Sequence, residues 1–198
     1  SINYNAYTGS AKLTITGVPA KVITLPTPVN GIISYNKAEQ ELFNAGTTDT
    51  KLWYSLDYDG DKEKATWYEA PPKGKDARIY NLYYFTDSDP NHSASTVSGP
   101  VVKEIEKAVP TVVTAPVSVN NLSYNKADQV LVKAGTTDDE CTLMYAAVKW
   151  DGTEPEVLSK NDAKWSDKLP KGKDAGKYRV FWYVKGNDNY KDVDPSAA

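Results

Sequence analysis

The sequence predicts an all-β protein built from two tandem antiparallel β-sandwich domains. Segments rich in Val, Ile and Thr alternate with a period of two, turn signals recur along the chain, and a stretch of roughly 90 residues is written twice. No amphipathic helix is predicted. The best candidate, Asn36 to Phe43, is followed almost at once by Ala45-Gly46, which ends a helix too early.

The internal repeat defines the two domains. "SYNKAEQELFNAGTTD" (Ser34 to Asp49) matches "SYNKADQVLVKAGTTD" (Ser123 to Asp138) at an offset of 89 residues. "PKGKDA" at Pro72 to Ala77 recurs at Pro170 to Ala175 at an offset of 98 residues, so the second copy carries a nine-residue insertion between the two motifs. Two copies of this length indicate two domains of one fold.

The ends of the chain fall out of phase with the repeat. Asn3-Tyr4 aligns with Asn91-His92, so residues 1–17 are expected to be the terminal strand of a preceding repeat. The first repeat then covers 18–107 and the second 108–198, with the last strand of the second repeat expected to be missing. We therefore expect a window on a longer array, and hypothesise that Ala11 to Thr16 fills the missing strand position, in the same or a neighbouring molecule.

The expected strands follow the runs of β-branched and aromatic residues in chain order. They are "KLTIT" at 12–16, "KVITL" at 21–25, "STVSGPVV" at 95–102, "TVVTA" at 111–115 and the alternating run from Tyr178 to Lys185. Turns are expected at Asn30-Gly31, Asp59-Gly60, Lys73-Gly74, Asp151-Gly152 and Gly186-Asn187.

Composition and charge exclude several classes of protein. The chain has 198 residues, a net charge of −3 and a sequence pI of about 5.3, so no electrostatic footprint for nucleic acid is present. No apolar run approaches the roughly 20 residues that span a bilayer, so no membrane insertion is expected. The single cysteine, Cys141, excludes an internal disulfide.

The motif "KDAGKYRV" predicts a chain corner. An acidic turn at Asp174 leads into Tyr178, and Val180 follows two residues later; Tyr80 and Leu82 are the equivalents in the first repeat. This pattern resembles the immunoglobulin tyrosine corner, in which the tyrosine hydroxyl bonds to backbone of the preceding turn. The resemblance implies immunoglobulin-like domains in which Val180 and Leu82 replace the second cysteine of the inter-sheet bridge.

The longer pattern, from "L-S-Y-N-K-A" through "A-G-T" and "W-S" to "P-x-G-x-D-A-G-x-Y-x-V", is similar to the MBG-like immunoglobulin-like repeat of bacterial surface proteins. The resemblance covers both copies and implies an extracellular or cell-surface setting. It favours a non-catalytic stalk or adhesive segment whose partners are neighbouring repeats and, in an adhesive role, a glycan or a host surface protein. The alternative is a carbohydrate- or host-ligand-binding module, in a phage virion or accessory to a hydrolase.

Aromatic residues that the corner does not need are the best candidates for ligand binding. They are expected on an exposed sheet face, where they could stack on sugar rings: Tyr83, Phe85, Phe181 and Tyr183, with Trp53 and Trp150 as weaker candidates. The competing interpretation is cross-strand pairing that simply covers the sheet.

An acidic hairpin is the only candidate metal site. Asp57, Asp59, Asp61 and Glu63 alternate around Gly60, an oxygen-rich pattern of the kind that binds calcium. The spacing is not that of an EF-hand loop, and a solvated turn explains the same residues. No other cofactor is expected.

An enzyme is not expected. His92 is the only histidine, and its repeat partner Tyr190 is aromatic, so it is predicted to fill an aromatic place at a strand start. Cys141 has no repeat counterpart and no neighbouring histidine, and is predicted to be a half-buried thiol at a strand start. Neither a nucleophile elbow nor a phosphate-binding loop is present.

Overall fold

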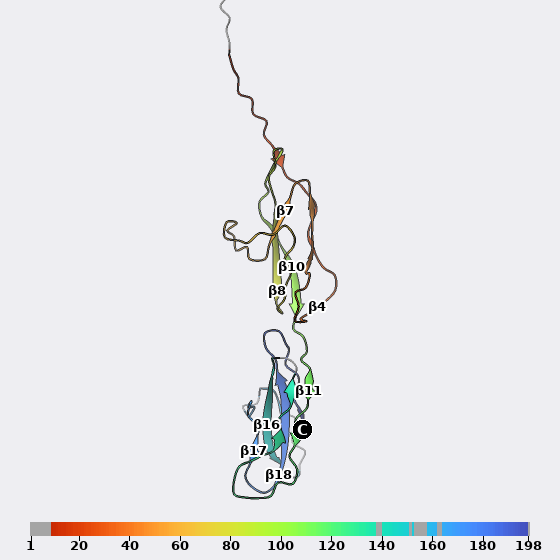
Figure 1. The fold of residues 1–198 in the computed structure, drawn as a ribbon, viewed down its shortest axis with the longest axis vertical. Coiled ribbons are helices and arrows are strands. Elements are labelled where there is room, and N and C mark those ends of the chain that lie inside the picture. Colours follow the sequence, from red (N-terminus) through yellow and green to blue (C-terminus); the bar gives the residue numbers. More distant parts are fainter. Residues whose placement is uncertain (1–8, 138–139, 151, 153–157, 162–163, 198) are drawn as a thin grey trace, which may run out of the picture. The chain divides into compact units, whose positions relative to one another are not determined.

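The computed structural model describes residues 9–137, 140–150, 152, 158–161 and 164–197 (Figure 1). Throughout these ranges the chain forms strands and turns without a helix, which confirms the predicted all-β class. The same ranges therefore contain no apolar helix long enough to cross a membrane. Residues 1–8, part of the predicted terminal strand, lie outside the described residues.

The chain divides into two compact units. The first runs to Val29 and also includes Glu41–Lys73 and Tyr80–Lys103, whereas the second includes Asn30–Gln40, Gly74–Ile79 and the chain from Glu104 onward.

Two segments of the first repeat belong to the second unit because they contact its residues. Ala77 N donates a hydrogen bond to Asn189 Oδ1 at 2.7 Å. The rings of Tyr35 and Tyr190 meet edge to face, with centroids 5.3 Å apart. The compact units therefore do not coincide with the boundaries of the sequence repeat.

The first repeat contains ten strands, several of them only two residues long. They are β1 (Val18–Pro19), β2 (Val22–Thr24), β3 (Thr27–Pro28), β4 (Ile33–Ser34), β5 (Phe43–Asn44), β6 (Thr47–Thr48), β7 (Leu52–Ser55), β8 (Ile79–Thr86), β9 (His92–Ser93) and β10 (Ser98–Glu106). The main sheet has the order β4-β10-β8-β7, and the pairs β2-β6, β3-β5 and β1-β9 are separate small sheets. β1 pairs with β9 in parallel, in the register Val18↔His92.

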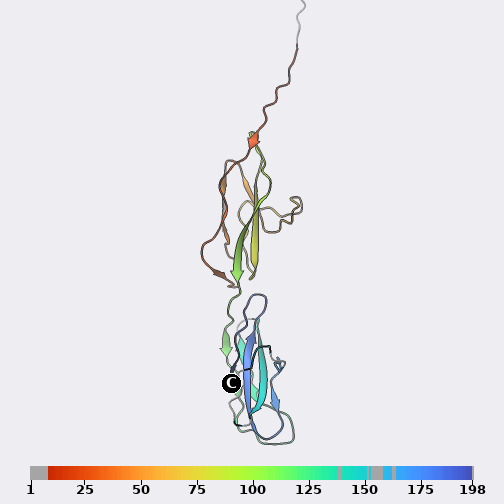
Figure 2. The ribbon, with the colours of Figure 1, turned by 180° about the vertical axis from the view of Figure 1, so that it is seen from behind.

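The second repeat uses a similar order of elements. Its strands are β11 (Val112–Thr114), β12 (Val117–Ser118), β13 (Gln129–Val130), β14 (Val132–Lys133), β15 (Thr136–Thr137), β16 (Thr142–Trp150), β17 (Lys171–Gly172), β18 (Lys177–Lys185) and β19 (Ser196–Ala197). The pairs β11-β15, β12-β14 and β13-β17 accompany a main sheet of order β16-β18-β19. The long strands β16 and β18 are the cyan and blue arrows of Figure 2.

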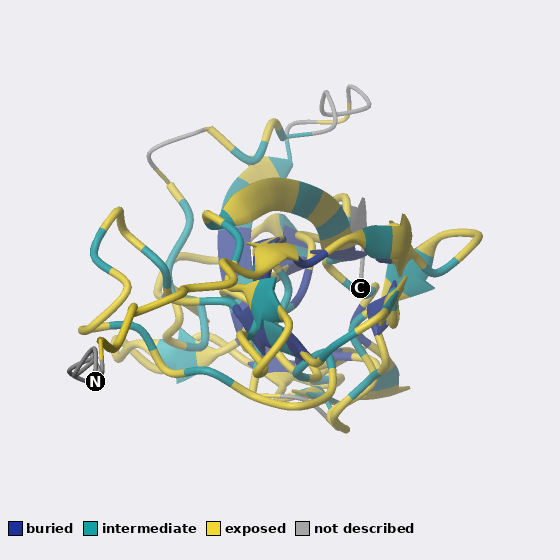
Figure 3. Cartoon of the chain, turned by 90° about the horizontal axis from the view of Figure 1, so that it is seen from above, coloured by how far each residue is buried: buried dark blue, intermediate teal, exposed yellow. Residues whose placement is uncertain are grey.

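Burial follows a period of two over the first part of β8, whereas β18 is buried on both of its faces. Tyr80, Leu82 and Tyr84 are buried in β8, and Val180, Phe181, Tyr183 and Val184 are buried in β18. Figure 3 draws the buried parts of the chain in dark blue. Leu82 is 0% and Val180 5% exposed, so the aliphatic residues predicted at the cysteine position do lie in the core. In the second repeat, Val180 packs in a cluster with Leu131, Val132, Leu143 and Tyr145.

Candidate functional site

The predicted aromatic surface is not exposed. Phe85 is 7%, Phe181 2% and Tyr183 6% exposed, and Tyr83 is half-buried. The expectation of an open aromatic face is therefore wrong for three of the four residues. The reason is a tryptophan in each repeat, Trp67 after β7 and Trp165 after β16, whose ring packs against the sheet.

In the first repeat, Trp67 closes this face. Its ring meets Phe85 edge to face with centroids 4.7 Å apart, and its Nε1 donates to Lys62 O at 2.9 Å. Tyr58 packs against both Trp67 and Tyr83, at centroid distances of 5.9 and 5.1 Å. The segment is fixed by two backbone bonds, because Tyr68 N donates to Tyr54 O and Tyr54 N to Tyr68 O, each at 2.8 Å.

The second repeat contains the same arrangement. Trp165 meets Tyr183 edge to face at 4.8 Å, and its Nε1 donates to Ser159 O at 2.6 Å. Ser166 and Tyr145 exchange backbone hydrogen bonds of 2.9 and 2.7 Å, which repeats the bridge of the first copy. Burial also raises the pKa of the Tyr183 hydroxyl. Edge-to-face pairs of this kind stabilise a packed aromatic layer.

The two weaker candidates are half-buried and held by polar groups. Trp53 Nε1 donates to Asp87 Oδ2 at 3.0 Å, and Lys51 Nζ lies 4.6 Å from the ring centroid. That indole bond is the main cause of the lowered pKa of Asp87. Lys177 Nζ lies 4.8 Å from the centroid of Trp150. Trp53 lies directly opposite Phe85 in the β7–β8 pair, so it shares a sheet face with one of the four residues above, whereas Trp150 lies opposite Lys177.

The tyrosine corner is present in the second repeat. Tyr178 Oη donates to Asp174 O at 2.8 Å, which is the back-bond that the motif predicts. Tyr80 occupies the equivalent place in the first repeat and is 4% exposed. These residues are structural: they fix the chain where it enters β18 and β8.

A second repeated tyrosine contact was missed by the sequence analysis. Gly46 N donates to Tyr54 Oη at 3.0 Å, and Gly135 N donates to Tyr145 Oη at 3.3 Å. Burial raises the pKa of the Tyr54 hydroxyl. In each repeat a strand that bears a tyrosine follows "AGT", but the glycine and the tyrosine are 8 residues apart in the first repeat and 10 in the second, so the sequence offered no fixed spacing from which to predict the contact.

The acidic hairpin does not form a metal cluster. Across the described ranges, no group of three or more His, Cys, Asp or Glu side chains is placed to hold a metal ion, so the structure does not bring Asp57, Asp59, Asp61 and Glu63 together. The carboxylates instead shape the turn. Asp57 Oδ1 accepts from Ser55 Oγ at 2.6 Å and from Thr66 N at 2.9 Å, which lowers the pKa of Asp57.

Asp59 and Asp61 act in the same way along the hairpin. Asp59 Oδ1 accepts from Asp61 N at 3.2 Å and Asp61 Oδ1 accepts from Glu63 N at 3.0 Å. The Lys64 ammonium, 3.0 Å from Asp61 Oδ2, is the main cause of the lowered pKa of Asp61. Side chains bound to neighbouring backbone in this manner are characteristic of solvated Asx turns.

His92 and Cys141 occupy the places that the repeat predicts. His92 begins β9, its Nδ1 lies 2.9 Å from Asp89 Oδ1, and its Nε2 lies 3.7 Å from Asp49 Oδ2. The Asp89 carboxylate raises the pKa of His92, and the imidazole in turn lowers the pKa of Asp89. Cys141 is half-buried directly before β16, and Asn187 Nδ2 lies 3.9 Å from its sulfur. No nucleophile adjoins His92 in these contacts.

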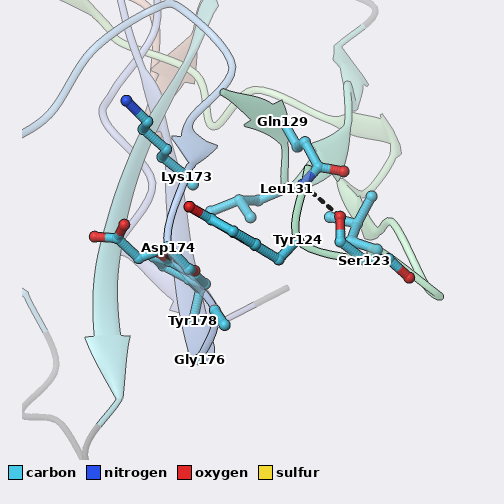
Figure 4. A pocket seen from close by; sticks show the side chains of 11 residues that line it. Ser123, Tyr124, Gln129, Leu131, Lys173, Asp174, Gly176 and Tyr178 are labelled. Carbon is cyan, nitrogen blue, oxygen red and sulfur yellow. Dashed lines mark hydrogen bonds between the residues drawn. The ribbon is translucent and has the colours of Figure 1, made fainter. Parts of the chain in front are cut away.

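One hollow in the second repeat lies beside the tyrosine corner (Figure 4). It has a volume of about 170 Å³ and is lined in part by Leu122, Tyr124, Leu131, Gly176 and Tyr178. Gln129 Nε2 donates to Ser123 O at 3.0 Å at its margin. Ser123, Gln129, Lys173 and Asp174 also line it, so polar and charged side chains contribute beside the aliphatic and tyrosine surface.

Comparisons with models of protein families, with curated proteins and with solved structures found no match to this chain.

Proposed function

We propose that the chain is a non-catalytic structural segment, composed of two immunoglobulin-like β-sandwich modules, of an extracellular or cell-surface bacterial protein. Its role is to carry tension and to space a distal part of the protein from the cell. Its partners are the neighbouring repeats of the same protein. The resemblance of both copies to surface-protein repeats supports the setting, and the hydrogen bonding at the ends of each repeat supports the mechanical role.

The observation that carries this proposal is a set of backbone hydrogen bonds at the start of each repeat, which tie the entering chain to a later segment of the same repeat. In the first repeat, Val18 N donates to Asn91 O and Ala20 N to Ser93 O, each at 3.0 Å. In the second repeat, Ala108 N donates to Asn189 O at 3.0 Å and Lys191 N to Ala108 O at 2.8 Å. The bridges at both points are parallel, and they involve equivalent positions of the repeat.

The exit of the first repeat is held in the same manner. β10 lies between β4 and β8, and Tyr35 N donates to Glu106 O at 2.9 Å near the end of the strand. Because ladder hydrogen bonds are perpendicular to the strands, a pull along β10 loads several of them at once. A strand whose hydrogen bonds are loaded together resists a pulling force better than a strand whose hydrogen bonds break one after another.

The ligand-binding alternative depended on an exposed aromatic face, and three of the four aromatic side chains expected there are buried. Two of its strongest candidates, Phe85 and Tyr183, pack against Trp67 and Trp165, and these contacts are equivalent in the two repeats. Residues that recur because they close a core need no ligand to explain them.

Single-molecule extension of the full chain tests the proposal. We expect two discrete unfolding events, each releasing about 300 Å of contour, since ~90 residues extend at ~3.5 Å each. Extension without resolved force peaks would contradict a load-bearing role. A glycan array on the same protein provides the second arm, because saturable binding to a defined glycan would favour the binding module instead.

A further inference from the structure

A loop of the second repeat, residues 187–190, contacts two segments of the first repeat within the second compact unit. Ala77 N donates to Asn189 Oδ1 at 2.7 Å, and Asn189 Nδ2 donates to Asp76 Oδ1 at 3.3 Å. The Tyr35 ring meets the Tyr190 ring edge to face, with centroids 5.3 Å apart. One asparagine amide therefore binds a backbone turn, and the aromatic ring next to it packs against a tyrosine.

The loop is held in shape by bonds inside its own repeat. Asn187 Oδ1 accepts from Asn189 N at 2.9 Å and from Tyr190 N at 3.0 Å, which forms an Asx turn. Ala108 N donates to Asn189 O at 3.0 Å, and Ala108 pairs in parallel with Tyr190. The backbone of residues 187–190 is therefore fixed by the second repeat itself, and we call these residues the docking loop.

The first repeat contains the same loop. At the repeat offset of 98, three of its residues correspond to the turn residue, the amide and the aromatic ring of the docking loop: Asp89, Asn91 and His92. Asp89 Oδ1 accepts from Asn91 N and from His92 N, each at 2.7 Å. Val18 N donates to Asn91 O at 3.0 Å, and Val18 pairs in parallel with His92. Residues 89–92 therefore form a second docking loop of the same construction.

The segments that occupy the docking loop also occur twice. Their motifs, "SYNKA" and "GKDA", recur in the second repeat, which places Tyr124, Asp174 and Ala175 at the equivalent positions. Tyr124 is 59% exposed, and Asp174 and Ala175 are exposed as well. Tyr35 and Ala77, which make the contacts in the first repeat, are half-buried. We call the surface formed by the two motifs of one repeat its tyrosine-and-turn end.

Burial distinguishes the two docking loops. Asn189 is half-buried and Tyr190 is 8% exposed, whereas Asn91 is exposed and His92 is half-buried. The loop at 89–92 thus has the backbone shape and the side-chain types of the occupied loop, with its amide open to solvent. A preformed loop of this kind binds without first having to be ordered.

We propose that the docking loop at 89–92 binds the tyrosine-and-turn end of a neighbouring repeat. The Asn91 amide accepts a hydrogen bond from the alanine N–H of the neighbour's "GKDA" turn and donates one to the aspartate of that turn. The His92 ring packs against the tyrosine of the neighbour's "SYNKA" segment. This inference rests on the proposed function, which gives the chain neighbouring repeats as partners, and it names the surfaces through which they meet.

The proposed contact is smaller than the one at residues 187–190. In the second compact unit, Lys191 Nζ also reaches Glu106 Oε2 at 3.5 Å, but Ser93 stands at the position of Lys191 in the first repeat. Two hydrogen bonds and one ring contact bind weakly between separate molecules. Within one protein they suffice, because a short tether supplies an effective concentration on the order of millimolar.

Disulfide trapping between separate chains tests the proposal, with the second repeat of another molecule as the probe for the neighbour. In a Cys141→Ser background, chains carrying Asn91→Cys are mixed with chains carrying Ala175→Cys in a glutathione buffer. The control is Asn81→Cys, which is equally exposed but lies on β8. We expect the mixed dimer to form about tenfold faster or more with Asn91→Cys than with Asn81→Cys, because docking holds the two thiols within bonding distance. Equal rates would overturn the proposal.

A second comparison tests the docking mode. Tyr124→Ala in the Ala175→Cys chain removes the ring that would meet His92, and we expect it to slow trapping by about threefold or more. Lys133→Ala, an exposed substitution elsewhere in the same repeat, should leave the rate unchanged. If the two substitutions have equal effects, the tyrosine does not take part and the proposed docking mode is wrong.

Failure of this inference is distinguishable from failure of the proposed function. The unfolding events expected on extension depend on hydrogen bonds inside each repeat, so they persist in a chain whose docking loop binds nothing. Loss of those events, with trapping at Asn91→Cys intact, would instead overturn the load-bearing role and leave the docking site in place.

Discussion

Removing the Trp67 ring should destabilise the first repeat as a core substitution would. The edge-to-face contact with Phe85, at 4.7 Å, contributes about 1 kcal/mol, and the Nε1 bond to Lys62 O contributes about 1 kcal/mol more. Half of a tryptophan ring removed from water adds roughly 1 to 2 kcal/mol. We therefore expect Trp67→Ala to lower the free energy of unfolding by about 3 kcal/mol, near the lower end for buried tryptophans.

The assay is urea denaturation of the full chain followed by circular dichroism, with thermal unfolding as a second probe. A loss of about 3 kcal/mol lowers the midpoint of a domain of this size by about 12 °C or more. Trp67→Phe is the matched variant: it keeps an aromatic ring over Phe85 but loses the indole bond, so about a third of the effect should remain. A change below about 0.5 kcal/mol in Trp67→Ala would refute the conclusion that this ring closes the sheet, because that is the range of ordinary surface substitutions.

Three further predictions concern the turns. Tyr178→Phe removes the corner hydrogen bond and should cost about 1 kcal/mol of unfolding free energy, measured by urea denaturation. Gly135→Ala should cost about 1 to 3 kcal/mol in the same assay, because the added Cβ would lie 2.5 Å from Thr114 O. His92, the only histidine, should titrate by NMR above the ordinary value of about 6.5, and Asp89→Asn should return it toward that value.

The sign of the histidine effect follows from the raised pKa. Protonated His92 pairs with Asp89, so the stabilisation is fully present below a pH of about 6.5 and is lost as the pH rises through the pKa of the folded state. The lowered pKa of Asp89 sets the lower pH limit, since the stabilisation from the Asp89 carboxylate is lost as the pH falls through that pKa. An NMR pKa at or below about 6.5 would contradict the pairing.

Each of the other two predictions has a control in the same repeat. Tyr124→Phe removes the hydroxyl of a tyrosine that is 59% exposed and should leave stability within about 0.5 kcal/mol of the parent chain. Ala134→Ser changes the exposed neighbour of Gly135 and should be equally mild. If Tyr178→Phe is no more costly than Tyr124→Phe, the corner bond does not stabilise the fold; if Gly135→Ala matches Ala134→Ser, the close backbone approach is not rigid.

The repeat allowed the all-β class and much of the core to be predicted. Val180 and Leu82 were placed in the core by the spacing of the corner motif, and both are buried. The back-bond of Tyr178 followed from the same motif. These features depend on local spacing and on strand periodicity, which a sequence displays directly.

The burial of the aromatic face could not be predicted in the same way. Period-two alternation separates the two faces of β18, but it does not say what covers each face. Tyr183 is covered by the ring of Trp165, and the sequence between β16 and β17 has no regular pattern that predicts this contact. The one available clue was the pairing of Trp67 with Trp165 in the repeat, since a tryptophan that recurs in an irregular segment usually packs against something.

The calcium interpretation of the acidic hairpin is wrong for a related reason, and the solvated-turn interpretation is the one that holds. Alternating carboxylates have the composition of a calcium loop, but ligand geometry depends on where the oxygens point. Here Asp57 and Asp59 accept hydrogen bonds from nearby backbone and side-chain donors, which fixes their oxygens inside the turn. Composition alone does not distinguish these two uses of a carboxylate.

The central claim is that each repeat closes the aromatic face of its sheet with its own tryptophan-bearing segment. Hydrogen exchange at the amides of Tyr68 and Ser166 tests it most directly, because these amides donate to Tyr54 O and Tyr145 O at 2.8 and 2.9 Å only when the segments are docked. We predict protection at both amides close to that of β8 and β18. Exchange at the rate of an open loop, with the sheets themselves protected, would show that the face is open and would contradict the claim.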